Sequence, residues 1–142
     1  MIGGVLKVTV PSWMSATEID AAVETMTEHF RRKQSTERFD LPARAASLSR
    51  RYGLPIPTDI RWGGEMSSRW GSCTPSTGVV RLSTRLATFP DWVVDYVIVH
   101  ELAHLEVANH SAGFWRLVRR YPKTERATGF LIAKSAEATD WL

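Results

Sequence analysis

The chain has 142 residues, of which 44% are hydrophobic and 23% charged, a length and composition typical of one soluble globular domain and not of a disordered chain. No apolar run approaches the roughly eighteen residues that cross a bilayer, and residues 1–11 lack the basic start and long apolar run of a signal peptide. The single cysteine, Cys73, excludes an internal disulfide and is compatible with a reducing compartment. We therefore expect a cytoplasmic protein.

The net charge of +3 is unevenly distributed along the chain. Between residues 31 and 51, seven basic residues stand against two acids. Such a region is typical of a solvated helix face, or of weak contact with nucleic acid. No pattern of aromatic residues for base stacking accompanies the charges, which favours the solvated face. The basic residues are Arg31, Arg32, Lys33, Arg38, Arg44, Arg50 and Arg51.

The N-terminal third of the chain predicts one strand and two helices. Val5–Val10 alternates apolar and polar residues, as a strand does. A helix should follow from Ser15 or Thr17 to about Lys33, because apolar residues recur there at helical spacing. A second helix is expected over Leu41–Tyr52, and Gly53 ends it.

The middle of the chain predicts a small antiparallel sheet. Short strands are expected at 60–62, 66–73 and 79–83, joined by segments rich in Gly, Pro, Ser and Thr. If 66–70 forms a sheet edge, an extended peptide can pair with it.

Helices dominate the remainder of the predicted fold. A helix over 91–108 is apolar nearly all round, which places it in the centre of the domain. Ser111 should cap a short helix that ends before Pro122, and a last helix is expected over 124–138. The architecture is α+β. We expect a single domain over 1–142, made of an N-terminal strand and helices (1–58), a sheet with the functional core (59–121) and a C-terminal helix (122–142).

The central helix contains the sequence His100-Glu-Leu-Ala-His104. Residues four apart lie about 40° apart around a helix, so the two imidazoles point the same way and can share a metal ion. Glu101 lies about 100° round the axis, where it can reach a water on the metal without ligating it. Two histidines and a glutamate in an apolar helix would cost several kcal/mol if buried without partners. The pattern predicts a catalytic zinc site.

A third ligand is expected from His110. On a continuous helix its side chain would point about 80° away from that of His100. Asn109 tolerates the left-handed conformation that ends helices, and Ser111 caps the next helix, so the chain can turn at Asn109 and bring His110 back to the metal. Three histidines leave a fourth position open to water, as in catalytic zinc sites.

These residues also carry a family resemblance. Ser68-Arg-Trp-Gly-Ser-Cys73, Val80-Arg-Leu82, the central helix, Asn109-His-Ser111 and Phe114-Trp115 together resemble the YgjP-like metallopeptidase family, which is similar to SprT-like zincins. The resemblance covers about 44–121. It implies a zincin-like core, zinc held by His100, His104 and His110, and Glu101 as the catalytic residue.

Further candidates surround this motif. Tyr96 precedes His100 by one turn, and Arg69 belongs to a strand expected beside the helix. Either can stabilise negative charge in the transition state, although core packing for Tyr96 and a structural ion pair for Arg69 are competing interpretations. Cys73 is an alternative third ligand, as in deformylases, but we expect it to be buried and inert.

The sequence thus predicts a zinc metallopeptidase in which Glu101 activates a zinc-bound water for attack on a peptide carbonyl. One alternative is a zinc hydrolase of a small amide, for which a deep closed pocket is the distinguishing feature. Another is a zinc-stabilised module that binds nucleic acid or a partner through the basic 31–51 region without turnover. The ligand set also accepts other divalent ions.

Overall fold

The computed structural model describes residues 13–135. The predicted strand at 5–10 lies outside this range. The predicted C-terminal helix over 124–138 ends earlier, at Lys134, because Ser135 is extended. In the described part of the chain, no helix combines the length and apolar character that a bilayer crossing requires. The elements in chain order are α1 (Ala16–Glu37), α2 (Leu41–Tyr52), β1 (Asp59–Trp62), β2 (Gly71–Thr74), β3 (Val79–Leu82), the 3-10 helix η1 (Thr84–Thr88), α3 (Asp91–His104), α4 (Ala112–Val118) and α5 (Thr124–Lys134).

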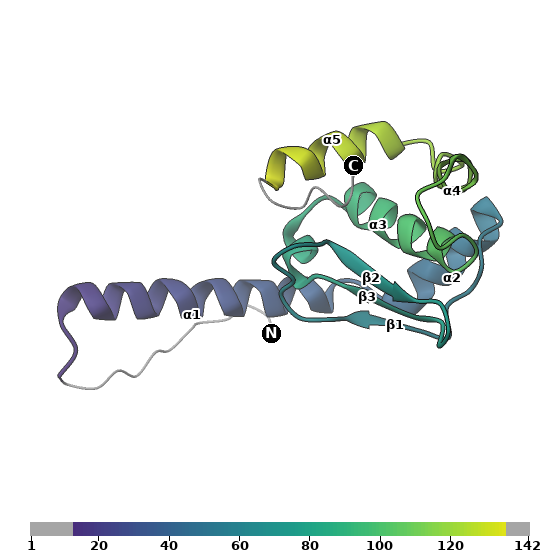
Figure 1. Cartoon of the computed structure of the whole chain (residues 1–142). Coiled ribbons are helices and arrows are strands. Elements are labelled where there is room, and N and C mark those ends of the chain that lie inside the picture. Colours follow the sequence, from purple (N-terminus) through teal and green to yellow (C-terminus); the bar gives the residue numbers. More distant parts are fainter. Residues whose placement is uncertain (1–12, 136–142) are drawn as a thin grey trace.

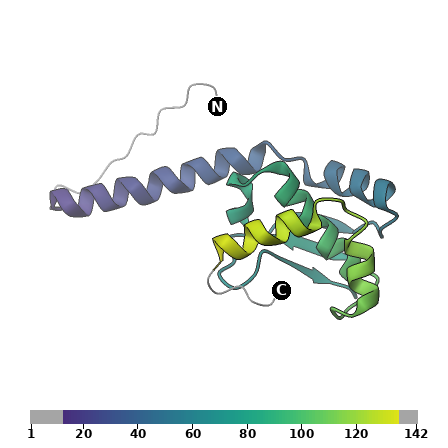
Figure 2. The ribbon, with the colours of Figure 1, turned by 90° about the horizontal axis from the view of Figure 1, so that it is seen from above.

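The predicted α+β architecture is confirmed, with α3 at its centre. Helix α3 contacts β2 and β3 on one side and α2, α4 and α5 on others. It lies between the sheet and α5 (Figure 1). Its residues from Tyr96 to Ala103 are all buried, as expected for a helix that is apolar all round. Figure 2, seen from above, shows the N-terminal part of α1 extending away from this body.

Local capping signals set most helix ends as predicted. The Ser15 side chain accepts a hydrogen bond from the Glu18 N–H at the start of α1, and Asp40 accepts one from Ala43 N–H at the start of α2. Gly53 ends α2 in the left-handed conformation, with φ of 64°. Helix α1 continues to Glu37, one turn beyond the predicted end.

The sheet is mixed, so the prediction of an antiparallel sheet was wrong for one strand pair. The strand order is β1-β3-β2. Strands β2 and β3 form an antiparallel hairpin, with Cys73 opposite Val80. Strand β1 pairs with β3 in parallel, with Ile60 opposite Val80. Strand β2 lies between β1 and β3 in the sequence. The chain reverses direction once to enter β2 and once more to enter β3, so β1 and β3 run the same way.

The prediction of a strand at 66–73 was wrong for its first half. Residues 66–70 form an irregular segment, and β2 begins only at Gly71. The backbone groups of Met66 bind side chains instead of a strand: its N–H donates to the Ser83 hydroxyl, and its carbonyl accepts from the Arg85 guanidinium at 3.0 Å. These bonds satisfy the backbone groups of Met66 without a strand partner.

Ion pairs tie the basic region to α3. The Arg38 guanidinium lies 2.8 Å from the Asp91 carboxylate, and that of Arg44 lies 2.8 Å from Asp95. These cations therefore already have acidic partners within the fold, and the structure gives no support to nucleic-acid contact through 31–51.

The Arg44–Asp95 pair should contribute measurably to stability. Burial raises the pKa of Asp95, and Arg44 opposes that shift. Replacing Arg44 by methionine should lower the free energy of unfolding at pH 7 by about 1–3 kcal/mol, because it leaves the carboxylate in a poorly solvated place. The pKa of Asp95 in the folded variant rises further, so the deficit should shrink as the pH falls and Asp95 becomes protonated.

Urea unfolding at several pH values measures this effect. Arg50, exposed on the same helix, provides the matched control, and Arg50→Met should change the stability by less than about 0.5 kcal/mol. A deficit for Arg44→Met that is the same at every pH would contradict the role of the Asp95 charge.

Candidate metal centre

Two imidazoles of α3 lie one turn apart on the same face of the helix. The ring centroids of His100 and His104 are 4.9 Å apart. His100 is 2% exposed, while His104 is half-buried at the end of the helix. The four-residue spacing therefore brings the two side chains together as predicted.

The turn that brings in the third histidine differs from the predicted one. Helix α3 ends at His104, four residues earlier than expected, and its last turn tightens through a bond from Leu105 N–H to Leu102 carbonyl. Among the described residues only glycines have positive φ, so Asn109 is not left-handed. Ser111 then caps α4 as predicted, by accepting a hydrogen bond from Phe114 N–H.

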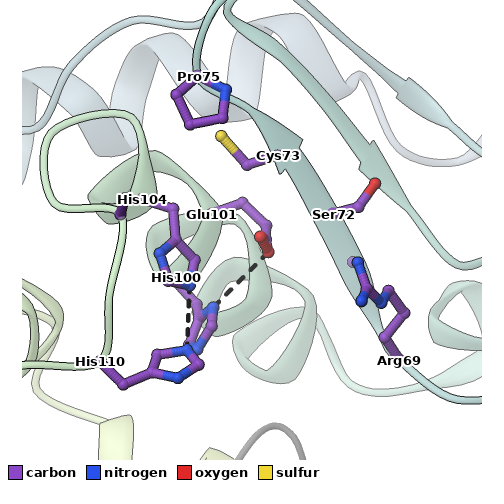
Figure 3. A pocket seen from close by; sticks show the side chains of 10 residues that line it. Arg69, Ser72, Cys73, Pro75, His100, Glu101, His104 and His110 are labelled. Atoms are coloured by element: carbon purple, nitrogen blue, oxygen red, sulfur yellow. Dashed lines mark hydrogen bonds and ion pairs between the residues drawn. The ribbon is translucent and has the colours of Figure 1, made fainter.

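The loop between α3 and α4 places His110 beside the other two histidines. Its Nε2 lies 3.1 Å from Nε2 of His104, and one nitrogen from each of the three histidines lies within 4.8 Å of the others. Two nitrogens bound to one zinc ion at 2.0–2.1 Å in tetrahedral geometry are about 3.3 Å apart. The cluster therefore has the dimensions of a three-histidine site (Figure 3).

The protonation state of the two helix histidines also suits a metal. Burial, and secondarily His110, lowers the pKa of His100 to about 3, and burial lowers that of His104. The His104 Nδ1 lies 3.1 Å from the Val107 carbonyl oxygen. A carbonyl only accepts, so Nδ1 carries the proton and Nε2 keeps its lone pair facing His110. A neutral imidazole with a free Nε2 lone pair, as at His104, is what a divalent ion requires.

Glu101 lies beside the three histidines and is not one of the cluster. It is 3% exposed, and its Oε2 lies 3.6 Å from Nδ1 of His100. Burial raises the pKa of Glu101 to about 7, against the opposing effects of His104, Arg69 and His110. A carboxyl group with this pKa can accept and release a proton near neutral pH.

Strand β2 forms the opposite wall and approaches Glu101 closely at Gly71. A Cβ atom on Gly71 would lie 3.2 Å from Cγ of Glu101 and 3.2 Å from a methyl carbon of Val97. Glycine therefore lets the strand lie against the helix at this point. Between the two elements lies a pocket of about 340 Å³. Its lining residues are Arg69, Gly71, Ser72, Cys73, Pro75, His100, Glu101, His104, Ala108 and His110.

The other predicted site residues are placed differently. Arg69 lines the pocket, but from the exposed loop before β2 and not from a strand. Tyr96 is 1% exposed and does not line the pocket, and its ring centroid lies 6.0 Å from that of His100. Cys73 is only half-buried, in contrast to our expectation, and it lines the pocket wall.

Burial and the nearby charge of Glu101 raise the pKa of the Cys73 thiol to about 11, and Cys73 does not belong to the cluster of three histidines. Four lining residues were not predicted as site residues from the sequence: Gly71, Ser72, Pro75 and Ala108. Gly71 and Ser72 belong to the motif at 68–73, in which the glycine indicates a close approach but does not identify its partner. Pro75 and Ala108 carried no signal in the sequence.

Comparisons with known proteins agree with this geometry. The family described as "YgjP-like, metallopeptidase domain" matches residues 15–131. The structure is similar to that of the metallopeptidase zymogen abylysin of Pyrococcus abyssi, with 22% identity and a TM-score of 0.58 over 65% of this chain and 91% of that one. It is also similar to the metallopeptidase zymogen jannalysin of Methanocaldococcus jannaschii, with 20% identity and a TM-score of 0.57 over 68% of this chain and 97% of that one.

No curated protein matches the sequence. At these identities the two solved structures establish a common fold, which is the α+β architecture around α3. The family match extends over most of the chain and includes all the residues of the histidine cluster. The resemblance inferred from the sequence motifs is therefore confirmed, and the chain belongs to the YgjP-like metallopeptidase family.

Proposed function

We propose that the chain is a zinc-dependent peptidase in which Glu101 is the catalytic acid and base. The observation that carries the proposal is the buried carboxyl group of Glu101 beside three histidine nitrogens that lie within 4.8 Å of one another. This set of groups at the base of a pocket is the arrangement that metal-assisted amide hydrolysis needs.

Each polar group has a definite role in the proposed reaction. His100, His104 and His110 would hold the ion, which supplies Lewis acidity that polarises a carbonyl and lowers the pKa of water. Glu101 takes a proton from the attacking water and then passes it to the leaving amine. Burial raises the pKa of Glu101, which makes its carboxylate a better base toward the water.

The substrate is best accommodated as an extended peptide along β2. In the described part of the chain β2 is an outer strand of the sheet, and three of its residues line the pocket. An outer strand offers unpaired backbone groups to a second strand. The sequence placed such an edge at 66–70, whereas β2 occupies Gly71–Thr74. Recognition through the backbone implies little sequence preference.

Arg69 remains our candidate for stabilising negative charge on the substrate, because its side chain lines the pocket on the Glu101 side (Figure 3). Tyr96 is left out of the proposal, since it is buried in the core and does not line the pocket. A cytoplasmic location remains a prediction from the sequence.

The two alternative functions gain no support from this geometry. Arg69, Pro75, Ala108 and His110 are exposed, so the pocket is open to solvent and is not the closed chamber expected for a small amide. Arg38 and Arg44 form ion pairs with acidic residues of α3, so their charges are not available to contact a nucleic acid. An open cleft favours peptide or protein substrates.

Metal removal tests the proposed function. Hydrolysis of a fluorescently labelled unfolded protein should fall to the buffer rate after dialysis against a chelator, and stoichiometric Zn²⁺ should restore it, because the three histidines alone provide no Lewis acid. Mg²⁺ at the same concentration is the control and should not restore hydrolysis, since it prefers oxygen ligands. Full hydrolysis by the metal-free protein would refute the proposal.

A further inference from the structure

A single aromatic ring contacts all three histidines of the metal centre. Phe114 of α4 is 0% exposed. Its ring centroid lies 4.3 Å from that of His104, 5.0 Å from that of His100 and 5.0 Å from that of His110. Trp115, its neighbour, lies 5.9 Å from His100 and from His110, and is only half-buried.

The three contacts have different geometries that together fix the imidazoles. Phe114 stacks on His104 with an interplanar angle of 26°, and meets His100 and His110 edge-on at 78° and 69°. A flat ring in these positions opposes rotation of each imidazole about its own side-chain bonds. The stacked contact keeps His104 in the orientation in which Nδ1 reaches the Val107 carbonyl.

The turn that caps α4 places this ring. His110 directly precedes the cap residue Ser111, and Phe114 N–H donates to the Ser111 hydroxyl at 3.4 Å. The loop that delivers the third histidine therefore also anchors the ring against the first two. Helix α4 is seven residues long, so it is held in place mainly by packing against α3.

We propose that Phe114 is a positioning residue for the metal: its ring holds the three imidazoles so that their nitrogens converge before an ion arrives. This inference rests on the proposed function, because it assumes that the histidines bind a metal. Metal affinity depends on the side chains that contact and orient the ligands as well as on the ligands themselves. Loss of such a supporting side chain commonly weakens metal binding by about 10–100-fold.

Phe114→Leu tests the inference, because leucine keeps much of the apolar volume and loses the flat ring. We expect its Kd for Zn²⁺, measured by competition with a chromophoric chelator, to rise about tenfold or more. The visible spectrum of the Co²⁺-loaded protein should also change, since it depends on the positions of the ligands. Phe114→Met is a second variant of similar volume, should the leucine variant fail to fold.

The matched control is Val118→Ala, a fully buried position on the same helix. It should destabilise the metal-free protein in thermal unfolding but leave the Kd for Zn²⁺ within about twofold and the Co²⁺ spectrum unchanged. Folded Phe114 variants with unchanged Kd and spectrum would overturn the inference, as would an equal loss of affinity in Val118→Ala. Failure of the unsubstituted protein to bind Zn²⁺ would instead refute the proposed function.

Discussion

Glu101→Gln should lower kcat for peptide hydrolysis by a factor of about 10²–10⁴, which is the usual contribution of a general acid and base. Glutamine has nearly the same shape as glutamate, but its amide cannot take a proton from water and return it to an amine. The side chain is 3% exposed and its pKa is raised, so removing the charge should not reduce the stability of the fold. Zinc content should remain stoichiometric, because Glu101 is not one of the three clustered histidines.

Steady-state hydrolysis of a labelled peptide, together with elemental analysis of the same samples, measures both effects. Glu106→Gln is the matched control, since Glu106 is exposed just beyond the end of α3 and should leave kcat unchanged. An active Glu101→Gln protein with full metal content would refute the proposed role of the carboxylate. Loss of metal in that variant would show instead that Glu101 helps to hold the ion.

His110→Ala should abolish stoichiometric zinc retention and hydrolysis together. His110 is the one cluster member that comes from the loop between α3 and α4, and its Nε2 lies 3.1 Å from that of His104. Without it, two protein ligands remain, fewer than the three that catalytic zinc sites use. Because His110 is exposed, the metal-free variant should unfold at nearly the same temperature as the unsubstituted metal-free protein.

Elemental analysis after extensive dialysis measures the retention. His29→Ala, at an exposed position on α1, is the matched control and should keep one zinc ion per chain. Zinc retained by His110→Ala would place the third ligand elsewhere. Cys73 would then be the first candidate, since it lines the same pocket, and a His110→Ala/Cys73→Ser double variant would test it.

The histidine cluster could be predicted because most of the site is local in sequence. A helix repeats every 3.6 residues, so the spacing of His100 and His104 was enough to put them on one face. The presence of His110 in the cluster was also predicted, but the predicted turn at a left-handed Asn109 was wrong. The chain leaves the helix at His104, and Val107 turns its carbonyl back to His104 Nδ1, a contact that no residue preference at Asn109 reveals.

The sequence by itself determined the elements whose stability is local. Helix caps at Ser15 and Ser111 and the end at Gly53 depend on hydrogen bonds between residues at most five apart, so residue type and spacing were sufficient. Tertiary structure alone decided which way β1 runs beside β3, where β2 begins, and that Gly71 lies against Glu101. It also decided that Phe114 contacts all three histidines. These features depend on pairing and packing between segments that are distant along the chain. A sequence pattern predicts that a residue is buried, but it does not identify the residues that pack against it.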